Sequence, residues 1–378
     1  MNKRNSFSLL IVAIAISLFS IIFYISRQWG NLKLNQSLSD HHKLIFLIHS
    51  SGTNDEYLFS VWIQMYPKDR KIGLYFINPL AKFSDEDEPL YRMKSAAKKV
   101  VAKQMSAISG RSPNFIINIG PDAFIKMVDL AGGIPIFLDP GSAISSETFQ
   151  RNVNDCYIMN GEDAYDYLTT LSSKEAISYV RRLERQESAL LAYFFHIKKQ
   201  KDLLKKQYFP ILSSWVDSNL QAEEWINLTE FLLNQDIEFG VGELPGEIQS
   251  SSKQEEYILK ISPDTAKIAY KKFEADILSE FFSDTERARV EVLNGTNING
   301  LAKKGKSLLN ERRIKVLTVE NAWKDNFKTS VILNRSGNTK ISKKISDAIA
   351  SDDIYFSIRK EYGLDATLIL GEDFAKKN

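Results

Sequence analysis

Residues 114–138, NFIINIGPDAFIKMVDLAGGIPIFL, decide the fold. The apolar run at 114–119 is typical of a strand, and Pro121 suits the first turn of a helix. In that helix apolar residues recur at i, i+3, i+4 and i+7, namely Phe124, Met127, Val128 and Ala131. Gly132 and Gly133 end the helix, and residues 134–138 return as a strand. This alternation of strand, helix and strand predicts a layered α/β sandwich.

The same alternation extends in both directions along the chain. Upstream, the pattern predicts strands at 44–48, 58–66 and 71–77 and a helix at 94–109. Downstream, it predicts a long helix from Ala176 to about Lys206 and then a largely helical stretch to about Phe239. After Thr285, strands at 288–293, 314–319, 330–334 and 366–370 alternate with helices at 301–312 and 341–350. This last part predicts a second, smaller α/β domain.

The N-terminus carries one long apolar segment. No charged residue occurs from Asn5 to Ser26, and a helix of this length would be about 33 Å long, which matches a hydrocarbon core of about 30 Å. Lys3 and Arg4 precede the segment, so the positive-inside rule predicts a cytoplasmic N-terminus and an extracytoplasmic bulk. No A-x-A-like cleavage site follows. We therefore expect an uncleaved, single-pass anchor in the cytoplasmic membrane rather than a cleaved signal peptide.

The domain boundaries follow from these changes of pattern. We expect a cytoplasmic tail at 1–4, a transmembrane anchor at 5–26, a linker at 27–43, a first α/β domain at 44–275, a linker at 276–287 and a second domain at 288–375. The polar composition of the first linker suits a tether between the bilayer and the first domain.

The charge balance and the cysteine content exclude some classes of function. Lys and Arg number 49 against 47 Asp and Glu, which argues against a nucleic-acid binder. Cys156 is the only cysteine, so the chain forms no internal disulfide, no cysteine-ligated zinc site and no redox pair. The four histidines lack the spacing of a metal site, and no G-x-S-x-G motif is present.

Three blocks of the first domain resemble the LytR-CpsA-Psr family of bacterial cell-envelope proteins. They are residues 117–134, the MNGEDA stretch at 159–164 and the RLERQ stretch at 182–186. In the second domain, VEVLNGT at 290–296 and GLA at 300–302 are similar to the opening of the LytR C-terminal domain.

The resemblance implies an α/β sandwich that holds a polyprenyl-pyrophosphate glycan. In such proteins the lipid lies in an apolar tunnel, and the pyrophosphate lies under arginines and a magnesium ion. They transfer the glycan phosphate to peptidoglycan. Arginine suits this task because its fork of N–H donors matches phosphate oxygens.

The resemblance also assigns roles to residues of this chain. It implies that Arg182 and Arg185 clamp the phosphate and that Gln186 orients it. Arg92 and Lys82 are the implied substrate-binding cations. Asp55 or Glu56 is the implied ligand of Mg²⁺.

The chain departs from the family pattern at several positions. The turn at 77–81 reads INPLA and has no arginine, and residues 165–173 lack the arginines that the family has there. The metal-binding aspartate of the family has no aligned partner. Helical periodicity places Arg182, Arg185 and Gln186 on one sector about 140° from the apolar residues, which indicates a solvated face. The resemblance instead implies that they line a pocket.

Three functions follow from these observations. The missing arginines favour a membrane-anchored protein that binds a polyprenyl-linked glycan and supports its attachment to peptidoglycan or another wall polymer, or envelope maintenance, with degenerate catalysis. The alternative is an active phosphotransferase that moves glycan phosphate from polyprenyl pyrophosphate to peptidoglycan. A transcriptional attenuator is disfavoured, because the anchor would place both domains outside the cytoplasm and no helix-turn-helix pattern is seen.

Overall fold

The computed structural model describes residues 34–377 except 41, 86, 141–154, 201–208, 252–255 and 280–286. The cytoplasmic tail and the transmembrane anchor expected at 1–26 therefore lie outside the described residues. Within the described part of the chain, no helix has the length and apolar character needed to cross a bilayer.

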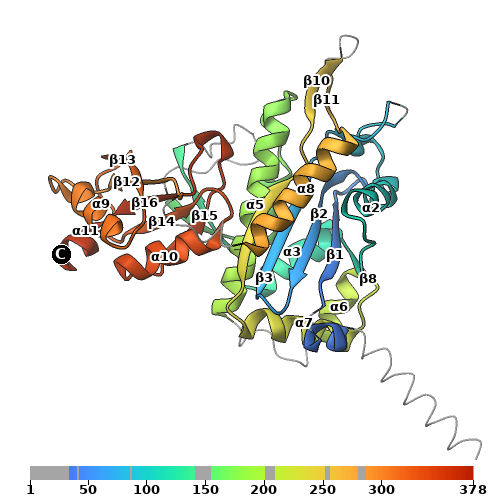
Figure 1. Cartoon of the computed structure of the whole chain (residues 1–378), viewed down its shortest axis with the longest axis horizontal. Helices are drawn as coiled ribbons and strands as arrows, with labels where there is room; N and C mark the ends of the chain where they lie inside the picture. The colour runs from blue at the N-terminus through green and yellow to red at the C-terminus, as the bar shows by residue number, and fades with distance from the viewer. Residues whose placement is uncertain are drawn as a thin grey trace, which may run out of the picture.

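A six-stranded sheet forms the centre of the first domain (Figure 1). Its strands, in spatial order, are β8 (Asp217–Ser218), β5 (Phe115–Ile119), β1 (Leu44–Ser51), β2 (Tyr57–Tyr66), β3 (Lys71–Ile77) and β9 (Glu238–Glu243). The β1–β2 and β2–β3 pairs are antiparallel, whereas β5 joins β1 and β9 joins β3 in parallel. Since both faces are covered, the central strands are apolar along most of their length.

Helices cover both faces of this sheet. On one face lie α2 (Ala96–Ser109) and α8 (Pro263–Leu278), which pack against Ile45 and Leu47. On the other lie α3 (Pro121–Leu130), α4 (Gly161–Thr169), α5 (Ala176–Lys199) and α7 (Ala222–Asn234), which share a core with Leu44 and Phe46. The predicted layered α/β sandwich is confirmed.

Smaller elements complete the domain. Strands β4 (Ala81–Lys82), β10 (Glu247–Ser251) and β11 (Glu256–Lys260) form a three-stranded sheet, and β6 (Ile134–Leu138) pairs with β7 (Asp155–Met159). A 3-10 turn, η1 (Leu90–Arg92), precedes α2, and the short helix α6 (Phe209–Trp215) precedes β8.

The second domain is built on a five-stranded sheet. The strand order is β13 (Val316–Asn321), β12 (Val290–Asn294), β16 (Ala366–Leu370), β14 (Val331–Asn334) and β15 (Ile354–Phe356). Helices α9 (Leu301–Glu311), α10 (Thr339–Ile349) and α11 (Glu372–Lys377) pack on one face, and the 3-10 turn η6 (Lys360–Tyr362) follows β15. The opposite face packs against Phe137 of β6, so the two domains share an apolar interface.

The largely helical stretch predicted to reach about Phe239 contains α6 and α7, but the two-residue strand β8 separates them and β9 begins at Glu238. Strand β9 contains Gly240 and Gly242, and glycine weakens the sequence signal of a strand. Gly242 is needed because a Cβ there would lie 2.8 Å from the Phe273 ring of α8. The long helix α5 ends at Lys199 rather than near Lys206.

We predict that Gly161→Ala destabilises the protein, whereas Gly120→Ala is tolerated. A Cβ at Gly161 would lie 2.4 Å from the carbonyl oxygen of Ile125, where the start of α4 approaches α3. No atom lies within 4 Å of a Cβ at Gly120, the N-cap of α3. We expect Gly161→Ala to cost about 2 kcal/mol or more, because backbone must move, and Gly120→Ala to cost little. Urea denaturation measures both values, and equal midpoints would contradict the prediction.

Candidate functional site

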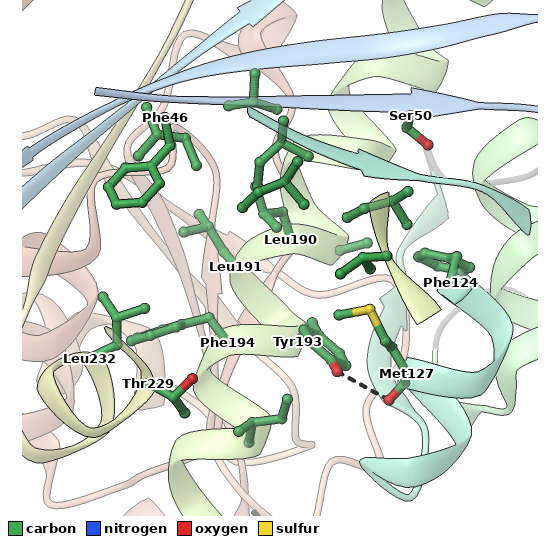
Figure 2. A pocket seen from close by; sticks show the side chains of 18 of the residues that line it. Phe46, Ser50, Phe124, Met127, Leu190, Leu191, Tyr193, Phe194, Thr229 and Leu232 are labelled. Carbon is green, nitrogen blue, oxygen red and sulfur yellow. Dashed lines mark hydrogen bonds between the residues drawn. The ribbon is translucent and has the colours of Figure 1, made fainter. Parts of the chain in front are cut away.

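An apolar cavity of about 340 Å³ lies between the sheet and helices α3, α5, α6 and α7 (Figure 2). Its lining includes Phe46 and Ile48 of β1, Ile117 of β5, Met127 of α3 and Leu190 of α5. The lining residues of α5 run from Gln186 to Ile197, which is about 16 Å along a helix. A cavity with such walls holds an apolar chain and repels a polar one.

Few polar side chains enter the lining of the cavity, and Ser50 and Gln186 are two of them. Phe194 contacts Phe239 of β9 edge to face, at the end of the sheet where β1 begins. Gln186 lies two helical turns earlier in α5, toward Ser50 at the other end of β1. Figure 2 shows Ser50 on the opposite side of the cavity from Phe194 and Leu232. The cavity therefore has an apolar body, with Thr229 beside Leu232 and Phe194 at one end and Ser50 and Gln186 toward the other.

Beside this end, α5 carries the predicted catalytic residues, and all three hold the C-terminus of α4. Arg182 Nη1 donates to the Thr169 carbonyl at 3.2 Å, and Gln186 Nε2 donates to the Leu168 carbonyl at 3.0 Å. Arg185 donates from Nε to the Tyr167 carbonyl at 2.8 Å and from Nη2 to the Thr170 carbonyl. The last carbonyls of a helix lack partners within the helix, so these side chains cap α4.

The solvated face that periodicity indicated for these residues is wrong. Arg182, Arg185 and Gln186 are only 5%, 7% and 2% exposed. Burial lowers the pKa of the Arg185 guanidinium to about 10, which leaves it charged at neutral pH. Of the three residues that the resemblance implied would line a pocket, Gln186 lies in the cavity wall, whereas Arg182 and Arg185 are not among the described lining residues.

Two buried polar atoms at this end have no hydrogen-bond partner among the described residues. They are Arg182 Nε and Gln186 Oε1. Buried polar atoms are nearly always paired in folded proteins, so such atoms mark a place where a ligand or water binds. Arg182 Nε offers a donor for a phosphate oxygen, and Gln186 Oε1 offers an acceptor for a hydroxyl or amide.

Aromatic rings connect Arg182 with the predicted substrate-binding residue Arg92. The Arg182 guanidinium lies 5.2 Å from the centre of the Tyr179 ring, and the Tyr179 and Tyr91 rings are 6.0 Å apart. Arg92 lies over the other ring, 5.8 Å from its centre. Sequence reasoning missed both tyrosines, and only the i, i+3 spacing of Tyr179 and Arg182 on a predicted helix could have indicated one of these contacts.

Lys82, the other predicted substrate-binding residue, lies in the small sheet. It pairs with Lys260 in the β4–β11 ladder. Lys260 and, to a lesser extent, Lys82 lower the pKa of the Asp85 carboxyl. The structure therefore gives Lys82 an acidic neighbour in the turn that follows β4.

The predicted metal ligands Asp55 and Glu56 lie in the turn after β1. Gly52 makes room for Glu56, since a Cβ at Gly52 would lie 2.5 Å from Glu56 Cγ. Glu56 faces Arg182. Burial lowers the pKa of the Arg182 guanidinium, whereas the nearby Tyr179 and Glu56 act to raise it.

These two carboxylates do not make a complete magnesium site. In the described parts of the chain, no three His, Cys, Asp or Glu side chains are grouped to hold a metal ion. Magnesium requires near-octahedral oxygen coordination, so phosphate and water would have to supply the other ligands.

We predict that Arg185→Ala destabilises the protein by about 3 kcal/mol, because it leaves the Tyr167 and Thr170 carbonyls without their charged donor. The control is Arg181→Ala. Arg181 is the neighbouring arginine, 43% exposed, with its guanidinium 3.8 Å from Glu361. Exposed ion pairs contribute about 0–1 kcal/mol. Thermal and urea denaturation of both variants measures the difference, and a similar small loss in each would contradict the capping role.

Comparison with known proteins identifies the second domain and the fold of the first. Residues 287–374 match the LytR_C family, described as "LytR cell envelope-related transcriptional attenuator". No curated protein matches the chain.

Solved structures match the first domain. TagT bound to LIIa-WTA is 14% identical, with a TM-score of 0.51, over 62% of this chain and 91% of that chain; TagT is a B. subtilis protein. The Bacillus subtilis protein ywtF, described as a proposed transcriptional regulator, is 15% identical, with a TM-score of 0.50, over 63% of this chain and 92% of that chain. Residues 287–374 therefore belong to the LytR_C family, and the domain before them has the fold of TagT and ywtF, which confirms the predicted resemblance to LytR-CpsA-Psr proteins with a LytR C-terminal domain.

Proposed function

We propose that the protein binds a polyprenyl-linked glycan and supports its attachment to peptidoglycan or another wall polymer. The observation that carries the proposal is the apolar cavity, beside one end of which Arg182 and Gln186 lie buried. The isoprenoid chain would occupy the apolar body, and the diphosphate and first sugar would lie beside Gln186 and Arg182. TagT, which shares the fold, is described as bound to LIIa-WTA and to LI-WTA, and this supports the choice of ligand.

The proposed location is the outer side of the cytoplasmic membrane. The charge-free segment from Asn5 to Ser26 supports this, because it is long enough to anchor the chain with its N-terminus in the cytoplasm. A lipid-linked substrate in the same bilayer then needs to move only a short way to reach the cavity. The wall polymer that accepts the glycan lies on the same side.

A binding role with degenerate catalysis is favoured over an active phosphotransferase. The guanidinium donors of Arg182 and Arg185 already serve three carbonyls at the end of α4. A phosphoryl transfer site needs preorganised donors aimed at the charge that develops, and the loss of one typically costs 10²- to 10³-fold in rate. In the alternative, a peptidoglycan hydroxyl loses its proton and attacks the glycan phosphorus, and polyprenyl phosphate leaves. A transcriptional attenuator, the third function, finds support in the descriptions of the LytR_C family and of ywtF, but in no feature of the site.

We predict that Ala189→Phe weakens the binding of polyprenyl diphosphate at least tenfold and leaves the melting temperature nearly unchanged, because the ring enters the cavity. The control is Ala192→Phe. Ala192 is on the same helix and equally buried, at 3% exposure, but it is not among the described residues that line the cavity. There the added ring overpacks the core and lowers the melting temperature.

Binding of a labelled polyprenyl diphosphate to the full chain in nanodiscs tests this prediction. Unchanged affinity in the Ala189→Phe variant would show that the lipid does not occupy the cavity.

We predict that the full chain transfers no glycan when it is incubated with labelled polyprenyl-linked glycan, peptidoglycan and Mg²⁺. The label should stay with the lipid, because Arg182 Nη1 and Arg185 Nε and Nη2 are bound to α4 and the arginines that the family has at 77–81 and 165–173 are missing here. Magnesium is included because its role at Asp55 and Glu56 stays a prediction. Transfer that is abolished in the Arg182→Ala variant would establish the phosphotransferase instead.

A further inference from the structure

Helix α5 is buried on two opposite faces by two different domains (Figure 1). At 100° per residue, Arg182, Arg185 and Gln186 point to one side, toward α4 and the cavity. Glu184, Glu187 and Ser188 point to the other side. This part of α5 therefore has two chemically different faces. Its cations and an amide face the site, and its carboxylates face the second domain.

The second domain contacts this acidic face through the segment between β15 and η6. The backbone N–H of Lys360 donates to Glu184 Oε1 at 2.9 Å, and the backbone N–H of Ile358 donates to Ser188 Oγ at 2.9 Å. The Lys360 ammonium donates to Glu187 Oε1 at 2.7 Å and also to Glu243 of β9. One short segment of the second domain thus joins α5 to the edge strand β9.

These contacts are important for the docking of the second domain on α5 because the carboxylates are buried. Glu187 is 0% exposed and Glu184 is 3% exposed, whereas the Lys360 side chain at the rim retains 36%. Burial raises the pKa of the Glu187 carboxyl well above its ordinary value, although Lys360 opposes the shift. Removal of the cation from such a cluster leaves a buried charge without its partner, which is strongly unfavourable.

Other contacts fix the same relative position of the domains. Arg335, which is 2% exposed, binds Asp139 after β6, and the Ser357 hydroxyl donates to the same carboxylate at 3.3 Å. Thr339 Oγ1 accepts from the backbone N–H of Phe239 at 2.8 Å. The second domain is therefore packed against the first through charged, polar and apolar contacts.

We propose that the LytR_C domain positions the ligand-binding segment of α5, with Lys360 as the positioning residue. Lys360 holds the acidic face of α5, and this keeps Gln186, on the opposite face, in the cavity wall and Arg182 beside that end of the cavity. The effect on a ligand rests on the proposed function, whereas the effect on α5 itself does not.

The test compares Lys360→Met with Lys304→Met, a removal of one exposed lysine from α9 of the same domain. Full chains in nanodiscs are titrated with polyprenyl diphosphate and with polyprenol, which occupies the cavity but lacks the charged head. We expect Lys360→Met to weaken diphosphate binding about tenfold, within the usual range of coupling between sites, and to leave polyprenol binding unchanged. Lys360→Arg should restore the affinity, and Lys304→Met should behave as the wild type.

The outcomes separate positioning from loss of stability. Equal weakening of both ligands, or weakening of neither, would overturn the proposal. The double variant Glu187→Gln with Lys360→Met guards against misfolding, because it removes the lysine together with the buried charge that it neutralises. If it folds and still binds diphosphate weakly, the positioning role is supported; if it binds as the wild type does, Lys360 has no such role.

Hydrogen exchange gives a readout that needs no ligand. We expect Lys360→Met to speed amide exchange in the middle of α5 and at the C-terminus of α4, and Lys304→Met to leave it unchanged. If the wild type binds neither lipid, the proposed function fails, and hydrogen exchange alone decides the role of Lys360. Unchanged exchange in Lys360→Met would then overturn the positioning role.

Discussion

The charged side chains in the middle of α5 are buried on both sides of the helix, so each needs a polar partner. The rest of the structure depends on these partners. The arginines of α5 bind the free carbonyls of α4, and its glutamates bind a lysine and backbone N–H groups of the second domain. An unpaired ion in this position would cost several kcal/mol. The end of α4, the middle of α5 and the docked domain are therefore fixed together, and a highly charged helix can lie in the interior of the protein.

The change of chemistry along α5 also shapes the cavity. Up to Gln186 the side chains that face α4 are charged or polar, and from Ala189 onward those that face the sheet are mostly apolar. The neighbouring strand β1 changes in the matching order, from Phe46 and Ile48 to Ser50. The helix and the strand lie face to face, and both change from apolar to polar side chains toward the same end. Together they produce a cavity for an amphiphilic molecule. Neither element alone would specify its orientation.

Local patterns predicted most of the elements but not the environment of the site. The helices α2 and α3 follow from periodicity, because the apolar stripe that marks them is a property of neighbouring residues. The burial of Arg185 depends on the carbonyls of α4, and that of Glu187 depends on Lys360, 173 residues away in the sequence. Periodicity treats charge as a sign of exposure and so predicted a solvated face. The resemblance pointed to the right helix, but it could not indicate that α4 holds the arginine donors or that the second domain covers the glutamates.

The position of Cys156 has a practical consequence. This half-buried residue of β7 packs against the apolar cluster that Phe137 of the first domain forms with Leu293 and Phe327 of the second. Thiol reagents attack the exposed thiolate, so modification of this side chain is faster when the surrounding surfaces part. Since the chain has no other cysteine, the unaltered protein contains its own reporter: a variant that loosens the contact between the two domains should be alkylated faster than the wild type.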